Sequence, residues 1–421
     1  LQAARDFPEH RTLLEFSGGI GRSSIAGSEA DFNTSFTVAN NPVHNTSVLL
    51  SGNLGFERQT PATAFRGVLR REMGNGSAPE VSVTLRQIFL PSTFWGRGEG
   101  RDDNLHSLTL AAGDRFQLAE SLRLEYGLLY DSISFLDRLN SFNPYGRVVY
   151  QATSSSSFQV YYTEGMPRLR LPGGDPLRQV ASQLAVFPRI SMRNGSPTVQ
   201  RGRHVEASFQ RKLKDSTVVQ AAMYRDDITN LTLNSVTNGT VMADFFPDIF
   251  TQQYSFNSGT YHTTGLRAAV QQNFSERVQA TFAYSYAGVL QPERNVLYSQ
   301  SPEELRSILK MQRRHALAAK LAADVPVTRT RVFAAYKWVL GTPVSAGDIY
   351  DESMAQAEPN LNIVVRQPLP HLVMLPGRVE ALADFRNLLA QGYVPIITAD
   401  GKRLLLVQNY RSFRGGFSFS F

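Results

Sequence analysis

Apolar and polar side chains alternate along many segments of this chain, each about ten residues long. In the stretch 122–130 the even positions hold leucine and tyrosine, whereas the odd positions include Arg123 and Glu125. Successive side chains of a β-strand point to opposite faces, so such a segment has one apolar face and one polar face. This pattern is typical of the spanning strands of a membrane barrel, and also of a half-buried strand in a soluble sheet.

Counting these segments predicts eighteen strands, and a closed antiparallel barrel of bacterial type requires an even number. Because boundaries read from sequence slip, about 16 to 22 strands are compatible with the pattern. A β-propeller would show a repeated blade motif, and an immunoglobulin-like array would break into units of about 100 residues, so neither fits. The expected strands are 12–22, 30–40, 45–58, 63–71, 79–90, 106–118, 122–135, 145–152, 158–163, 203–211, 217–231, 261–273, 278–289, 315–323, 329–339, 361–367, 378–387 and the C-terminal stretch 411–421.

The connections between these strands are expected to alternate strictly between short turns and long loops, with the final strand leading away from the long loops. Outer-membrane barrels have tight turns in the periplasm and long loops outside the cell, so we expect a periplasmic C-terminus. The longest loop, 164–202, has an apolar patch at 180–190 where we expect a short helix. Ser301-Pro-Glu-Glu304 predicts a helix start, with serine as the N-cap and proline at the first helical position.

The final strand carries the sharpest alternation. Phe417, Phe419 and Phe421 share one face, whereas glycine and serine occupy the other. In a soluble sheet these rings would lie in water or at an open edge, but in a membrane barrel they face lipid while the serines face a wet lumen. Such aromatic-terminated strands also resemble the C-terminal signal that the outer-membrane assembly machinery reads, so we expect these three residues to form it.

The composition excludes several classes of protein. No run approaches the ~18 consecutive apolar residues of a membrane helix, although barrel strands escape that test. The absence of cysteine removes disulfides, thiolate catalysis and zinc–cysteine sites. Lys+Arg number 43 and Asp+Glu 36, which gives a net charge of +7, but the basic residues are scattered rather than gathered into a stripe. We therefore expect no nucleic-acid partner.

Residues with reactive side chains form no recognisable site. The seven histidines, at positions 10, 44, 106, 204, 262, 315 and 371, show no metal-ligand spacing. Asp226 and Asp227 are adjacent on a predicted strand and so point to opposite faces, which favours a solvated strand end over a cation site. No Gly-x-Ser-x-Gly nucleophile elbow is present. We predict no catalytic residues, no metal site, no cofactor and no enzymatic activity.

An eighteen-strand barrel is wide enough for an aqueous lumen unless something fills it. The polar positions of the alternating strands are the candidates for lining that lumen and for setting selectivity by charge. They are Arg123, Glu125, Asp131, Gln279 and Lys337. Tyr336 and Trp338 are placed like the girdle aromatics found near a membrane interface.

Several short motifs lie in the last third of the chain. They are Arg314-His315-Ala-Leu-Ala-Ala, Ala323-Asp-Val-Pro326, Thr330-Arg-Val-Phe-Ala-Ala-Tyr-Lys-Trp338, Arg366-Gln-Pro-Leu-Pro370, Leu382-Ala-Asp-Phe-Arg-Asn-Leu-Leu389 and Arg414-Gly-Gly-Phe417. This region resembles the end of a TonB-dependent receptor barrel, and is most similar to the large receptor-like proteins common in acidobacteria. The earlier two thirds are compatible with that family.

The resemblance implies the fold and function of this family, but the chain departs from the family pattern in two ways. Family members carry an N-terminal plug domain, preceded by a box that contacts the energy-transducing partner, and their barrels usually have twenty-two strands. Here the first predicted strand begins near Thr12, which leaves no room for a plug, and the barrel is about four strands short. Either the plug and first strands are missing from this chain, or this is a plugless relative with a smaller barrel.

We therefore expect residues 1–421 to form one outer-membrane barrel domain without a plug, which takes up a solute or binds a surface ligand. The alternatives are a non-transporting barrel that anchors a partner, with loop 164–202 as its interaction element, and a passive porin. The expected partners are outer-membrane lipid, the assembly machinery and a separate plug or partner chain. The expected location is the bacterial outer membrane.

Overall fold

The computed structural model describes residues 10–20, 32–43, 45–57, 60–73, 76–89, 104–165, 176–184, 187–236, 245–247, 254–299, 301–345, 347–351, 360–370, 377–389, 394–398, 400–401, 403–407 and 411–421. Strands dominate these ranges, and the helices in them are α1 (Pro176–Leu184) and α2 (Pro302–Ile308). In this part of the chain no helix is long and apolar enough to cross a membrane.

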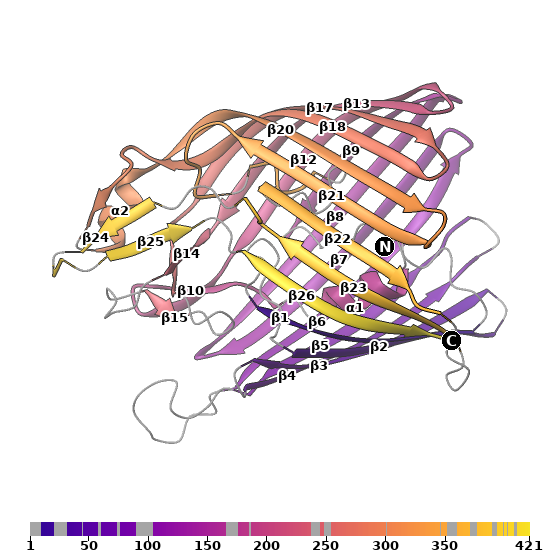
Figure 1. Ribbon diagram of the computed structural model, residues 1–421, viewed down its shortest axis with the longest axis horizontal. Coiled ribbons are helices and arrows are strands. Elements are labelled where there is room, and N and C mark those ends of the chain that lie inside the picture. Colours follow the sequence, from indigo (N-terminus) through magenta and orange to yellow (C-terminus); the bar gives the residue numbers. More distant parts are fainter. Residues whose placement is uncertain are drawn as a thin grey trace.

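Eighteen strands of the described ranges form one antiparallel sheet that closes on itself (Figure 1). The ring is completed where β26 pairs with β1, from Leu13↔Ser420 to Ile20↔Phe413. The predicted all-β antiparallel barrel of eighteen strands is therefore confirmed. Its strands are β1 (His10–Ile20), β2 (Phe32–Val43), β3 (Thr46–Glu57), β4 (Thr60–Arg71), β5 (Glu80–Ile88), β6 (Leu105–Ala119), β7 (Leu122–Phe135), β8 (Asp137–Thr153), β9 (Ser156–Glu164), β12 (Arg201–Lys214), β13 (Thr217–Thr229), β17 (Tyr261–Ser275), β18 (Val278–Pro292), β20 (Leu309–Val325), β21 (Thr330–Val339), β22 (Asn360–Pro368), β23 (Arg378–Arg386) and β26 (Ser412–Ser420).

The barrel has a short-turn end, where β6 and β7 meet across residues 120–121, and a long-loop end, where residues 165–200 connect β9 to β12. The predicted strict alternation of short and long connections is wrong at two places on the long-loop end. There Glu57 of β3 pairs with Thr60 of β4, and Phe135 of β7 pairs with Asp137 of β8. The long-loop end therefore carries two tight hairpins among its long loops.

The second hairpin appears because β8 starts earlier than the predicted residue 145. The stretch 140–144 is rich in Asn, Ser and Pro, which usually favour turns, and the predicted strand begins only after it. In the barrel these polar side chains have partners on the neighbouring strand instead. Asn143 is buried and its Nδ2 donates a 2.6 Å hydrogen bond to Asp131 Oδ2, while Phe142 on the opposite face is exposed.

The β7–β8 hairpin turns at Leu136, whose φ of 56° is left-handed. This conformation costs a residue with a Cβ about 1–2 kcal/mol, and the Leu136 side chain is exposed. Replacing Leu136 with glycine should therefore raise the free energy of unfolding by about 1 kcal/mol, measured by guanidinium titration in detergent micelles. Leu118→Gly is the control. It also removes an exposed leucine, but from within strand β6, and it should lower the free energy of unfolding. A Leu136→Gly barrel no more stable than the wild type would contradict this account.

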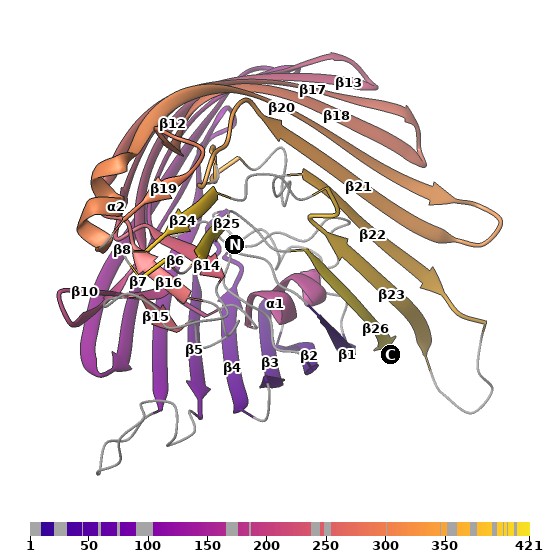
Figure 2. The same cartoon turned by 60° about the vertical axis from the view of Figure 1, so that its left-hand side comes forward.

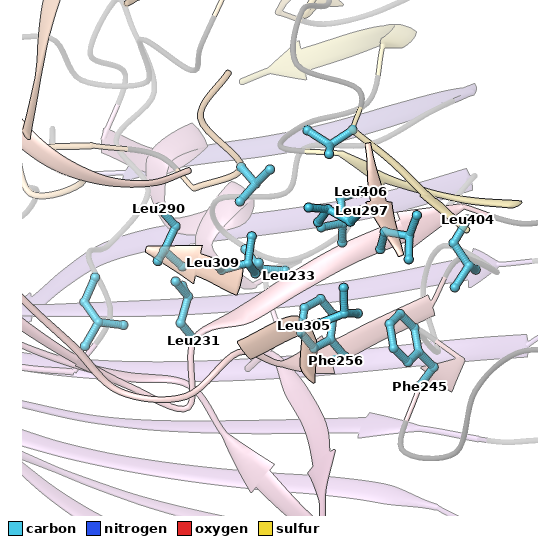
Figure 3. Packing of buried hydrophobic residues seen from close by; sticks show 14 residues of the cluster. Leu231, Leu233, Phe245, Phe256, Leu290, Leu297, Leu305, Leu309, Leu404 and Leu406 are labelled. Carbon is cyan, nitrogen blue, oxygen red and sulfur yellow. The ribbon is translucent and has the colours of Figure 1, made fainter. Parts of the chain in front are cut away.

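The long loops build a second, smaller sheet at their end of the barrel. Its six strands are β14 (Thr232–Val236), β15 (Phe246–Pro247), β16 (Tyr254–Asn257), β19 (Leu297–Tyr298), β24 (Val394–Ile397) and β25 (Arg403–Val407). They come from three different loops, and Val344 from a fourth joins their buried apolar core, which contains Phe256, Leu297 and Leu406 (Figure 3). We call this unit the cap.

Two sequence predictions fall within the cap. Ser301 is the N-cap of α2, because its side chain accepts a 3.2 Å hydrogen bond from the backbone N–H of Glu304, with Pro302 opening the helix. This confirms the predicted helix start. Leu305, on the same helix, is fully buried in the core of the cap. The helix therefore belongs to the packed body of the cap.

Candidate functional site in the lumen

The helix α1 lies inside the barrel, next to β2, β3 and β4 (Figure 2). It belongs to the long connection between β9 and β12, which also contains the hairpin of β10 (Ile190–Arg193) and β11 (Ser196–Val199). The predicted short helix in the loop 164–202 is therefore present, but it begins at Pro176 and ends before most of the predicted patch 180–190. The helix itself lies in the lumen and not on the outer surface of the barrel.

An apolar patch on the inner wall receives α1. Leu177 and Val180 of the helix pack on wall residues that are themselves buried. These wall residues are Leu13 of β1, Ala39 of β2, Leu49 of β3 and Val68 of β4. A wet lumen would be lined by polar side chains at such positions, so this patch is explained by the helix that covers it. Apolar burial of this kind contributes about 25 cal/mol per Å² of covered surface.

Arg178 of α1 ties the helix to the opposite side of the barrel seam. Its Nη2 donates 2.5 Å hydrogen bonds to Glu380 Oε2 on β23 and to Ser418 Oγ on β26. Its Nε also lies 3.8 Å from Glu15 Oε2 on β1. Glu380 accepts a second bond, at 2.6 Å, from Arg331 of β21. Arg178 and Glu380 are both buried, so the pair is stabilised by close, hydrogen-bonded geometry rather than by solvent.

A second segment of the chain enters the lumen from the β21–β22 connection. We call residues 340–351 the inner strap. The strap is fixed to β18 by a 2.8 Å bond from the backbone N–H of Val344 to the carbonyl of Leu290, and by one from the Leu290 N–H to Ser345 Oγ. Lys337 of β21 donates a 2.7 Å bond to the carbonyl of Gly347.

Arg267 of β17 is the charged centre of the strap's contact with the wall. It donates to both carboxylate oxygens of Asp348, at 2.9 and 3.1 Å, and to Glu206 Oε2 of β12 at 2.6 Å. Its Nε lies 3.3 Å from Asp351 Oδ1. Arg267, Asp348 and Glu206 are all buried, so the guanidinium is shared by three carboxylates in a water-poor environment. His204 Nε2 lies 3.6 Å from Glu206 Oε2, and the Lys337 ammonium lies beside the strap.

Tyr350 of the strap stacks on His204 of β12, with ring centroids 4.4 Å apart and an interplanar angle of 17°. His204 Nδ1 lies 2.5 Å from Asp226 Oδ1 of β13, and both side chains are buried. The Tyr350 hydroxyl donates a 2.7 Å bond to the carbonyl of Gly165, in the β9–β12 connection. It passes over Gly202, where a Cβ would come within 2.0 Å of the hydroxyl. The strap therefore links to the connection that carries α1.

Burial changes the acidity of the strap's ionisable groups. Burial raises the pKa of Asp348 to about 6, while the adjacent Arg267 guanidinium acts in the opposite direction. Burial also raises the pKa of the Tyr350 hydroxyl, and the nearby Asp226 adds to that effect. The docked strap therefore holds a proton on Asp348 more tightly than a strap exposed to water would.

The residues predicted to line the lumen do not come together in one place. Arg123 Nε lies 3.5 Å from Glu125 Oε1 on β7. Asp131, farther along the same strand, accepts 2.6 Å bonds from Thr109 and Asn143. Gln279 donates to Asn273 Oδ1 across the β17–β18 hairpin at 2.8 Å. Of the five, Lys337 is the one that contacts the inner strap.

The predicted aromatic positions occupy two strands. Tyr336 and Trp338 are half-buried on β21, alternating with the buried Ala335, Lys337 and Val339. Phe417 of β26 and Phe421, which directly follows this strand, are exposed. Phe419 of β26 is half-buried, with its ring 6.1 Å from that of Phe16 across the seam.

The main residues of the site were not found from the sequence. Arg267 and His204 were not singled out, because their partners lie on other strands and in a distant loop. Asp226 and Asp227 do point to opposite faces, as predicted, but Asp226 is buried against His204, so a solvated strand end is wrong for that residue. Within the described ranges no group of three or more His, Asp or Glu side chains is placed to hold a metal ion.

The closed barrel, with apolar side chains exposed on its outer wall and a charged lumen, defines an outer-membrane barrel of the transport type. The chain belongs to the TonB-dependent receptor-like β-barrel family, whose description it matches over residues 9–360. Proteins of this family are outer-membrane receptors and transporters, not enzymes, and they act with TonB. Among curated proteins, none matches the sequence.

Solved structures with a similar arrangement include three outer-membrane proteins. The ferric enterobactin receptor PfeA from Pseudomonas aeruginosa is 10% identical, with 99% of this chain and 81% of that chain covered and a TM-score of 0.43. The FrpB iron transporter from Neisseria meningitidis is 11% identical, with 99% and 82% covered and a TM-score of 0.45. The outer membrane transporter YddB from Escherichia coli is 12% identical, with 99% and 67% covered and a TM-score of 0.43.

Proposed function

We propose that this barrel takes up a solute, or binds a ligand at its long-loop end, and that α1 and the inner strap control access through the lumen. The observation that carries this proposal is the buried attachment of both segments to the inner wall through Arg178 and Arg267. Both segments belong to long connections rather than to the wall, so they can leave without opening the barrel. Solute passage would then require at least one of them to move.

The ion pairs that hold α1 and the inner strap support a lumen that can open more than one that is permanently closed. Segments held by ion pairs regain hydration of their charged groups when water enters, which offsets part of the lost attraction. The cap, in contrast, is held by an apolar core that is larger than the patch under α1, includes Val344 of the strap and gains nothing from water. The cap and the strap's Val344 therefore suit a fixed surface, whereas α1 and the ion-paired end of the strap suit displacement.

A barrel that anchors a surface partner is the second candidate, favoured by the cap. Three loops share one six-stranded sheet, which gives the long-loop end a defined surface for a partner or ligand. In this reading the partner binds the cap, because α1 of the connection 164–202 is inside the barrel. A passive porin, the third alternative, would need an open lumen, which α1 and the strap disfavour.

The proposal extends to membrane position and assembly. Residues 1–421 would form one barrel domain, since the cap takes its strands from barrel loops. The long-loop end would face outside and the C-terminus the periplasm. The proposed assembly signal is Phe417, Phe419 and Phe421, the proposed interface aromatics are Tyr336 and Trp338, and the proposed lumen residues are Arg123, Glu125, Asp131, Gln279 and Lys337. A separate plug or partner chain would be a further regulator of the lumen.

The test of the proposed function is single-channel conductance of the purified chain in planar bilayers, beside native mass spectrometry of the detergent extract. We expect low conductance with brief openings, because the lumen contains α1 and the strap. Large, steady openings of the wild-type chain alone would contradict the proposal and support a porin. A barrel that stays closed under all conditions, including in variants that release α1 and the strap, would support the anchor instead.

A further inference from the structure

Basic side chains gather on the outer face of the barrel, near the long-loop end, between β12 and β20. They are Arg203 of β12, Arg225 of β13, His262 of β17 and Arg313 of β20, which we call the outer basic cluster. The side chains of Arg203, Arg225 and His262 are 58%, 62% and 63% exposed. Arg203 lies between Gly202 and His204, which are buried on the lumen side, so its own side chain points outward.

One carboxylate orders most of this cluster. Arg203, Asp227 and His262 are register partners on three adjacent strands. Asp227 lies 3.9 Å from Arg203 Nε, 3.2 Å from Arg225 Nε and 2.7 Å from His262 Nδ1. Arg313 Nη2 donates a 2.7 Å bond to Thr264 Oγ1. Glu164 of β9, the register partner of Arg203, adds a second carboxylate on this face. Two carboxylates oppose three guanidinium groups, so the cluster keeps net positive charge and exposed guanidinium donors.

The outer basic cluster borders the apolar wall of the barrel. Moving toward the short-turn end, exposed apolar residues follow on the outer face, directly on β12 and β13, and after Thr264 on β17 and His315 on β20. They are Val205 on β12, Met223 on β13, Leu266 on β17 and Leu317 on β20. A band of this kind contacts acyl chains in a membrane barrel, so the cluster lies at the level where acyl chains give way to headgroups.

The opposite side of the barrel has no comparable charge at the strand ends described there. By strand order, β2 and β3 lie across the ring from β13 and β17. At their long-loop ends Phe32 and Phe56, which are register partners, expose aromatic rings on the outer face. The positive charge is therefore a property of one sector, which distinguishes a binding site from a general girdle of interface residues.

We propose that the outer basic cluster binds the phosphate of a phosphorylated lipid headgroup in the leaflet on the long-loop side. Arginine pairs of this kind match phosphate oxygens through two parallel N–H···O bonds, and the apolar wall below accommodates the acyl chains. A lipid is favoured over a free phosphate ion because its acyl chains can contact the apolar outer wall next to the cluster. A lipid is favoured over a soluble protein because the cluster lies at the edge of the apolar band, at the level of the headgroups. This inference rests on the membrane position in the proposed function, but not on transport.

The test compares Arg203→Gln/Arg225→Gln with the wild type in native mass spectrometry of lipid-stripped barrels. The probes are lipid A with its phosphates and the same lipid after their removal. We expect the wild type to retain the phosphorylated lipid, and the double variant to bind it about 30-fold more weakly, the scale set by two basic residues at an anionic lipid surface. Phosphate-free lipid should bind both proteins alike and weakly.

A matched control removes the same charge from the other end of the same hairpin. Lys212→Gln/Lys214→Gln should leave binding unchanged, because these side chains lie beside the β12–β13 turn at the short-turn end. Arg203→Lys/Arg225→Lys, which keeps the charge, should recover most of the affinity and shows that the wall still folds. Equal loss in the control pair, equal binding of phosphate-free lipid, or displacement of the lipid by low millimolar inorganic phosphate would each overturn the proposal. Conductance, measured on the same variants, should not change.

Discussion

Replacing Arg178 with alanine should release α1 from the lumen wall and increase single-channel conductance. The substitution removes the hydrogen bonds to Glu380 and Ser418 and leaves Glu380 buried with a weaker set of partners. Removing one member of a buried ion pair costs about 3–5 kcal/mol, and about 3 kcal/mol alone raises the undocked population about a hundredfold. Arg331 retains its bond to Glu380 and limits the effect to the lower part of this range.

A second variant and a control make the result specific to α1. Leu177→Asp places a carboxylate in the apolar patch of Leu13, Ala39 and Leu49 and should open the lumen as strongly as Arg178→Ala. Lys212→Ala removes a cation at the exposed short-turn end and should leave conductance at the wild-type level. If both α1 variants fold and conduct like the wild type, α1 does not restrict the path.

Replacing Arg267 with alanine should expel the inner strap. Without the guanidinium, the carboxylates of Glu206, Asp348 and Asp351 would face one another in a buried site. The loss of one partner from a buried pair costs about 3–5 kcal/mol, and we expect a loss in this range here, because His204 and Lys337 remain beside the carboxylates. Limited proteolysis should then cut within 340–351 of the folded barrel, and conductance should rise.

The expelled strap should return at acid pH. The pKa of Asp348 is raised to about 6 in the docked strap, against an ordinary value of 3.8, so the docked state binds the proton more tightly. Docking therefore strengthens as the pH falls through about 6 toward the ordinary value of 3.8, and this contribution is lost as the pH rises back through about 6. Arg267→Ala removes the cation that opposes this proton uptake, so the strap of this variant should regain protection against protease as the pH falls, whereas the wild-type strap is protected at neutral pH as well.

Arg267→Lys is the matched control for this site. Lysine keeps the positive charge but offers a compact ammonium in place of the forked guanidinium, so it can satisfy fewer of the three carboxylates at once. Protease resistance of the strap should fall between those of the wild type and Arg267→Ala. A strap that stays protected in Arg267→Ala at neutral pH would show that Tyr350 and the Val344–Leu290 bond are sufficient to hold it.

The wall of the barrel was predictable because the alternation of apolar and polar residues within each spanning strand shows which face is outward. Alternation along β7 assigns its faces without knowledge of any other strand, and the same holds for β26. The failure at β8 has a local cause, since Asn143 and Ser141 favour turns in isolation. Their partners on β7, such as Asp131, are supplied only by the sheet.

The helix α1 in the lumen could have been inferred from the sequence of the wall strands. The evidence is a set of adjacent apolar residues, which a strict alternation rule disregards. Where α1 packs, both faces of the wall strands are apolar, as in the adjacent pairs Leu13-Leu14, Val38-Ala39 and Leu49-Leu50. One member of each pair lies on the outer face of the barrel, and the other belongs to the buried cluster formed with the helix. A run of such pairs on neighbouring strands therefore predicts an internal apolar occupant. The Arg267 site left no comparable signal, because its charges become neighbours only through the strand register and the path of a distant loop.

The position of α1 also constrains the order in which the barrel can be built. The helix packs on β1 to β4 through Leu177 and bonds β23 and β26 through Arg178, so it spans the seam where the first and last strands meet. The seam pairs residues from the two extremes of the chain, which gives it the highest contact order in the described sheet and makes it a late, slow step. A helix docked on the early strands would present Arg178 to the arriving final strands, and would act as an internal template for ring closure.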